Sequence, residues 1–108
     1  MSDLSTILNS IKDETLAAAK AELVDYLTQA KTSGQQLAAE TAARLEDWLV
    51  QLGTGDIGQR DFKQLVQARR LVVLQWANTQ SITALAAAQK VVIEAIDIAL
   101  SKIAPALG

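Results

Sequence analysis

The chain has 108 residues, of which 50% are hydrophobic and 20% charged, and its formal net charge is −2. This size and polarity are typical of one folded domain and argue against disorder. The sequence contains neither Cys nor His, which excludes disulfides, thiol or imidazole catalysis, and zinc or haem sites built on those residues. A net charge so near neutral argues against nucleic-acid binding, which requires a strongly positive face.

The charge is distributed unevenly along the chain. Residues 1–52 hold four basic and eight acidic side chains, whereas residues 53–108 hold six basic and four acidic ones. The two halves therefore carry net charges of −4 and +2, and we expect them to attract each other.

The sequence predicts a cytoplasmic protein. No basic residue precedes an apolar run in the first six residues, so no secretory signal is expected there. The most apolar region, 82–104, contains Lys90, Glu94, Asp97 and Lys102, and a lipid-exposed span would tolerate these charges poorly. No transmembrane segment is therefore predicted.

The pattern of helix-forming residues predicts an all-α fold, an elongated antiparallel bundle of three to four helices in a single domain over residues 1–108. Ser33-Gly34 and the segment from Gly53 to Gly58 mark turns, and Pro105 is expected to stop the last helix at about Ala104. The apolar stripe of the first helix shifts sideways after Ile11, which indicates different neighbours along its length. The expected helices span about 4–31, 36–52, 60–78 and 82–104.

Residues 78–81 decide whether the last two helices are one. Asn78, Thr79, Gln80 and Ser81 are weak helix formers, but none is Gly or Pro, which slightly favours a continuous helix over 59–104. The apolar stripe moves to the opposite side from Ile82 onward, so two helices remain the alternative. A continuous helix would be about 69 Å long, and a second chain would be needed to cover it.

The second half of the chain is unusually apolar. From Leu71 to Ala104, 22 of 34 residues are apolar, more than the roughly three per heptad that a bundle helix requires. Surplus apolar surface on a water-soluble chain marks a partner, so we expect a homo-oligomer, with a dimer favoured. An unidentified protein is the other partner considered. The interface residues predicted on this basis are Trp76, Leu85, Val92, Ile96, Leu100 and Ile103.

Gly53-Thr54-Gly55-Asp56-Ile57-Gly58 matches the pattern G-x-G-x-x-G. The dinucleotide fingerprint also requires a strand before the motif and a βαβ unit around it. A predicted helix precedes the motif in this chain, and no strand pattern occurs. The segment is therefore predicted to be a loop between helices, and no cofactor is expected.

Arg69 projects onto the centre of an apolar stripe, where a charge is costly unless it is paired. We expect a buried ion pair with an acidic residue of the first half, such as Glu22, Asp25 or Asp47, or with a partner chain. An anion-binding role, for a phosphate or a lipid head group, is the less favoured alternative.

No catalytic or metal site is predicted. Glu94 and Asp97 lie three residues apart with Lys90 one turn earlier, an arrangement that is ordinary on a solvated or interchain helix surface. Glu94 and Tyr26 offer acid–base chemistry in principle, but nothing in the sequence places two such groups around a cleft.

These features predict a non-enzymatic helical bundle that self-associates and acts as an interaction or scaffolding module. Trp48 and Trp76 both lie on apolar stripes and serve in core packing or as interface anchors. The alternative function is a small carrier or surface-binder for an apolar ligand or lipid, which would use the same surplus apolar surface.

Overall fold

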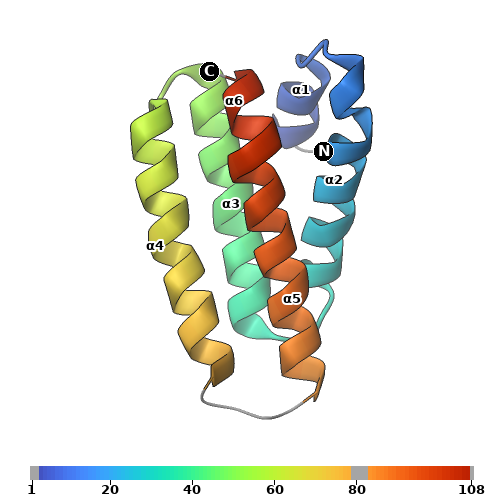
Figure 1. The fold of residues 1–108 in the computed structure, drawn as a ribbon, viewed down its shortest axis with the longest axis vertical. Coiled ribbons are helices and arrows are strands. Elements are labelled where there is room, and N and C mark those ends of the chain that lie inside the picture. Colours follow the sequence, from blue (N-terminus) through green and yellow to red (C-terminus); the bar gives the residue numbers. More distant parts are fainter. Residues whose placement is uncertain (1–2, 79–82, 108) are drawn as a thin grey trace.

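The protein is described by a computed structural model that gives the backbone of residues 3–78 and 83–107 and the side chains of residues 4–76 and 86–107. Four long helices form the bundle: α2 (Ala17–Lys31), α3 (Gln36–Thr54), α4 (Gln59–Asn78) and α5 (Thr83–Ile98). Each runs antiparallel to the one before it (Figure 1). The molecule measures 41 × 24 × 23 Å. The predicted all-α, elongated antiparallel bundle is therefore confirmed.

The four helices enclose one core. α2 and α4 each pack against α3 and α5, so α2 and α4 occupy diagonal corners (Figure 1). The sequence produces this core because each long helix repeats apolar residues at intervals of three and four, which places them on the inward side. The largest fully buried side chains are Phe62, Leu23, Leu45, Leu49, Ile96, Ile103, Val66, Val73 and Thr41.

The first predicted helix, 4–31, is wrong as one element. The chain instead forms α1 (Asp3–Asn9), the short 3₁₀ helix η1 (Glu14–Leu16) and α2. Ser10 Oγ donates to the Ile7 carbonyl at 2.6 Å, and the Asp13 carboxylate accepts from the Thr15 backbone N–H at 2.9 Å. Both side chains supply alternative partners to the backbone, which ends α1 and restarts the helix at η1. The break lets α1 fold back onto α3.

The expectation of one continuous helix over 59–104 is also wrong. α4 and α5 pack against each other along the bundle, which one straight helix cannot do. The change of apolar side at Ile82 was the informative signal, because each half turns its own apolar stripe into the same core. Residues 79–82 themselves lie outside the described residues.

Pro105 does not stop the last helix at Ala104. α5 continues through a π-helical turn, η2 (Ala99–Ile103), into α6 (Ala104–Leu107). In that turn the Ala104 backbone N–H donates to the Ala99 carbonyl, five residues back. The turn lies immediately before α6, so Pro105 falls in the first turn of a new helical segment, where its missing N–H costs little.

Glycines shape the turns that follow α2 and α3. Gly34 and Gly55 have φ angles of 80° and 86°, in the left-handed region that glycine adopts without a steric penalty. Gly53 has a different role, since it lies inside α3 beneath α1. A Cβ atom there would come within 2.7 Å of Ile7 Cδ1 and Cγ2. The G-x-G-x-x-G segment thus ends α3, caps it and leads into α4, with no strand in residues 3–78 or 83–107.

Candidate functional site

The structure separates the residues that the sequence placed at an interface. Val92, Ile96 and Ile103 are 2%, 1% and 0% exposed, so the chain's own helices cover them. Trp76 and Leu100 are half-buried at the edge of the core. Leu100 also lines a groove between α4 and α5 with Gln67 and Asp97. Leu85 lies in α5, and its side chain is outside the described part of the structure.

The exposed apolar surface lies on α4 instead. Of the large hydrophobic side chains described, four are markedly exposed, and three of these are on α4: Leu65 at 39%, Leu71 at 59% and Val72 at 43%. Exposed residues at helical spacing around them form a continuous outer surface, which we call the α4 face. It consists of Gln64, Leu65, Ala68, Leu71, Val72 and Gln75, all exposed.

The α4 face contains no charged side chain over three turns of helix. The two arginines beside it are paired within the chain. Arg70 Nε donates to Asp97 Oδ1 at 3.1 Å, and Arg69 Nη2 lies 3.8 Å from Glu40 Oε2. The face is therefore apolar and amide in character, which is typical of the centre of a protein interface.

Arg69, for which the sequence predicted a buried ion pair, is half-buried on α4. Its Nε donates to Thr41 Oγ1 at 2.9 Å, while its Nη2 is buried without a hydrogen bond. Burial lowers the pKa of Arg69, nearby Arg44 lowers it further, and Glu40 raises it. The carboxylate beside Arg69 belongs to the first half of the chain, as expected, but it is Glu40 rather than Glu22, Asp25 or Asp47. Since Thr41 and Glu40 surround the guanidinium, its local role is to link α4 to α3.

A second apolar surface lies on the other side of the bundle, between α1 and α2. Leu4 and Leu8 from α1 and Val24 and Leu27 from α2 line it. Three of the four are buried, whereas Val24 is 46% exposed. The opening extends to the edge of α3 and has a volume of about 570 Å³. We call it the α1–α2 groove.

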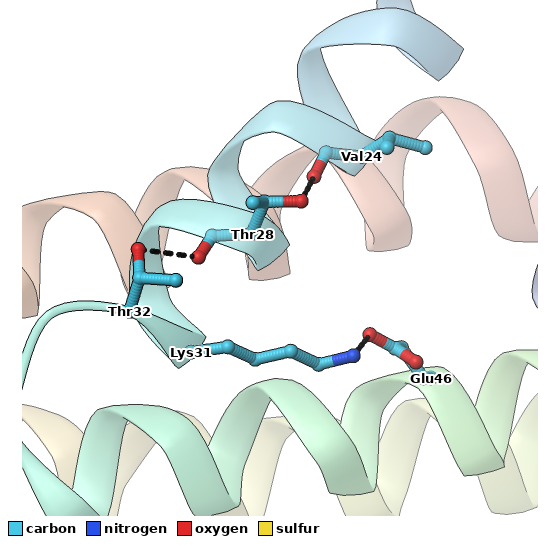
Figure 2. Close-up of polar contacts among 5 residues, drawn as sticks. All are labelled: Val24, Thr28, Lys31, Thr32 and Glu46. Carbon is cyan, nitrogen blue, oxygen red and sulfur yellow. Dashed lines mark hydrogen bonds and ion pairs between the residues drawn. The ribbon is translucent and has the colours of Figure 1, made fainter.

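Polar groups stand at the margins of the α1–α2 groove. Lys31 of α2 forms an ion pair with Glu46 of α3 (Figure 2). The Thr28 hydroxyl donates to the Val24 carbonyl at 2.9 Å (Figure 2), so its proton is used within the helix. Lys20 Nζ donates to the Ile11 carbonyl at 3.1 Å and the Leu8 carbonyl at 3.5 Å. These bonds hold the end of α1 against α2.

The remaining polar residues do not gather into a reactive cluster. Glu94 and Asp97 are exposed and Tyr26 is half-buried, and Asp97 is paired with Arg70. Among residues 3–78 and 83–107, no three His, Cys, Asp or Glu side chains form a group able to hold a metal ion. Trp48 and Trp76 pack against the core from its edge.

No protein-family model, curated protein or solved structure matches the chain. Within the described ranges, no helix is long and apolar enough to cross a membrane.

The sequence pattern does not separate the α4 face from the core side of α4, because Leu65 and Val72 are each followed by a buried valine, Val66 and Val73. The informative signal is the uncharged run on one side of the helix from Gln64 through Ala68 to Gln75, which follows Arg60 and Asp61 one turn earlier. The α1–α2 groove was missed because it exists only where α1 folds back, and the sequence predicted one unbroken helix there.

Proposed function

We propose that the protein is a non-enzymatic, cytoplasmic interaction module that self-associates through the α4 face. The observation that supports this is the concentration of exposed large hydrophobic side chains on one helix: Leu65, Leu71 and Val72. Contiguous apolar surface that remains in water is characteristic of a protein–protein contact.

A second copy of the chain is the partner that best fits this surface. The α4 face offers no charge for an oppositely charged partner to recognise, whereas an uncharged face is complementary to itself in a two-fold pair. Leu65 and Val72 are seven residues apart, with Ala68 between them. That spacing lets two α4 helices pack side by side, and the small Ala68 side chain permits close approach of their axes.

The free energy of this contact sets the protein concentration at which dimers should form. Complete burial of an aliphatic side chain contributes about 1.5–3 kcal/mol, and these three have roughly half of their surface left to bury, which gives about 4–9 kcal/mol for a pair of chains. Because association also costs translational and side-chain freedom, we expect dissociation constants in the micromolar range or weaker.

Light scattering coupled to gel filtration tests the proposal, with loading concentrations from about 10 to 500 μM chosen to bracket that range. We expect the mass of the wild-type chain to rise towards that of a dimer with concentration. Val72→Glu should remain monomeric throughout, because it introduces a charge at the centre of the contact.

The matched control is Val24→Glu, which changes a residue of similar exposure on α2, outside the α4 face. Its association should equal that of the wild type. A wild-type chain that is monomeric at every concentration would contradict the proposal, as would equal loss of association in both variants.

A further inference from the structure

The α1–α2 groove has the dimensions of a small-molecule site. Its volume of about 570 Å³ lies within the range of roughly 300–1,000 Å³ that ligand pockets occupy. Three chain segments build it, because α1 folds back beside α2 and Glu46 of α3 closes one edge. The site therefore depends on the tertiary fold and is not a surface of one helix.

The floor of the groove is aliphatic. Leu4, Leu8 and Leu27 are buried beneath it, and Val24 stands 46% exposed on its wall. The side chain of Thr28 adds little polarity, since its hydroxyl donates to the Val24 carbonyl (Figure 2). A linear hydrocarbon chain would find apolar contacts along this floor.

The charge of the groove selects the head group. Its lining holds two ammonium groups, Lys20 and Lys31, and one carboxylate, Glu46. Glu46 is paired with Lys31, whereas Lys20 donates only to backbone carbonyls in the described structure and forms no ion pair there. Lys20 also acts at longer range on Asp13, which lies outside the lining and whose pKa it lowers. The lining itself carries one more positive than negative charge, so an anionic group is the complementary one.

From this combination of an aliphatic floor and an excess of one positive charge in the lining, we propose that the α1–α2 groove binds a single-chain anionic amphiphile. Its head group pairs with Lys20, and its alkyl chain lies over Leu8, Val24 and Leu27. A second copy docking through its α4 face would not satisfy Lys20, because that face carries no anion. The inference does not depend on self-association, since α4 lies on the opposite side of the bundle from α1 and α2 (Figure 1).

Dodecanoate is the probe, titrated below its micelle concentration and followed by calorimetry and by backbone amide shifts. We expect one dodecanoate per chain, with binding at least ten-fold tighter than that of dodecanol, and with shifts concentrated in α1 and α2. Dodecyltrimethylammonium, which has the same chain and the opposite charge, should bind at least ten-fold more weakly than dodecanoate.

Four variants locate the site. Val24→Glu should weaken dodecanoate binding at least ten-fold, whereas Val72→Glu, at a residue of similar exposure on α4, should leave it unchanged. Lys20→Met should abolish the preference for dodecanoate over dodecanol, and Lys20→Arg should retain it. Urea unfolding shows whether each variant is still stably folded. The amide shifts of unliganded Lys20→Met show whether α1 is still docked.

Several results would overturn the proposal: no saturable binding, equal affinity for the three head groups, or equal weakening by Val24→Glu and Val72→Glu. Dodecanoate binding and oligomeric state are both measured on Val72→Glu. Binding that persists in a monomeric Val72→Glu chain shows that the groove acts independently of the α4 face. Failure of one proposal is therefore visible without failure of the other.

Discussion

The half-buried side chain of Arg69 has only part of its hydrogen-bonding capacity satisfied, because its buried Nη2 atom has no hydrogen bond. Thr41, itself 1% exposed, accepts the hydrogen bond from Arg69 Nε, and Glu40 lies at 3.8 Å from Nη2. A buried charge in such a setting contributes little net stability while it is paired, but is costly once it loses a partner. The arginine thus makes the α3–α4 contact sensitive to a single hydroxyl group.

We expect Thr41→Val to lower the free energy of unfolding by about 1–3 kcal/mol, because it leaves the Nε–H of the half-buried Arg69 side chain without an acceptor. In an Arg69→Met background the same substitution should cost close to nothing, since the donor is gone. Urea unfolding of the two single variants and the double variant measures this coupling. An equal cost of Thr41→Val in both backgrounds would contradict it.

Asp13 determines an acid-sensitive contribution to stability at the start of η1. Hydrogen bonds from the Thr15 hydroxyl at 2.6 Å and from its backbone N–H at 2.9 Å lower the pKa of Asp13, and Lys20 lowers it slightly more. A folded-state pKa below the unfolded one gives stability that is present above about pH 4 and is lost as the pH falls through the lowered pKa.

Comparison of the wild type with Asp13→Ala isolates this contribution. We expect the wild type to have the higher urea midpoint near neutral pH, and the two midpoints to converge as acidification protonates Asp13. Other carboxylates titrate in both chains and cancel in the difference. A difference that stays constant from neutral to strongly acidic pH would show that the charge of Asp13 is not responsible.

At the scale of elements, the docking of α1 depends on a glycine in another helix. Gly53 leaves the space that Ile7 occupies, with a virtual Cβ atom only 2.7 Å from two Ile7 carbons. One of these, Cγ2, is attached to the stiff β-carbon and cannot move away by rotation of a flexible chain end. The fit of α1 onto α3 is therefore close at this point.

Gly53→Ala should destabilise the protein by about 1–3 kcal/mol through overpacking, despite the better helix propensity of Ala. Combined with Ile7→Ala, the same change should become neutral or stabilising, because the clash is removed. Thermal or urea unfolding provides the measurement. Gly58→Ala is the control, since nothing lies within 4 Å of its added Cβ atom, and it should leave stability nearly unchanged.

Element boundaries were predictable where glycine and apolar periodicity agreed. The helix expected over 36–52 is α3, which ends two residues later at Thr54, and the one expected from residue 60 begins at Gln59. Boundaries made by side-chain hydrogen bonds were not predictable in this way. Ser10 and Asp13 end and restart a helix without Gly or Pro, and the π turn before Pro105 depends on backbone bonding that residue types do not encode.

For the whole molecule, self-association should couple stability to concentration. A contact that exists only between folded chains stabilises the folded state by mass action. We expect the melting temperature of the wild type to rise with protein concentration across the micromolar range, and that of Val72→Glu to stay constant. Calorimetry at several concentrations measures this, and a concentration-independent wild type would contradict the α4 contact.

The apolar composition of the second half predicted that apolar side chains would remain exposed, but it did not predict which ones. Val92, Ile96 and Ile103 lie on the inward side of α5 and η2, so their apolar surface is buried within the chain. Leu65 and Val72 lie on the outer side of α4, where they stay exposed. Which apolar side chains of a helix face inward depends on the tertiary arrangement, and composition alone does not specify it.

The diagonal placement of α2 and α4 has a consequence for what a pair of chains would present. Two copies joined back to back through α4 carry their grooves on the remote flanks, pointing away from each other. Such a pair would have two binding sites. It would bind a surface that displays several anionic chains more strongly than one copy does only where linkers or surface curvature let both sites reach that surface. Rigid back-to-back geometry instead favours bridging between two separate surfaces.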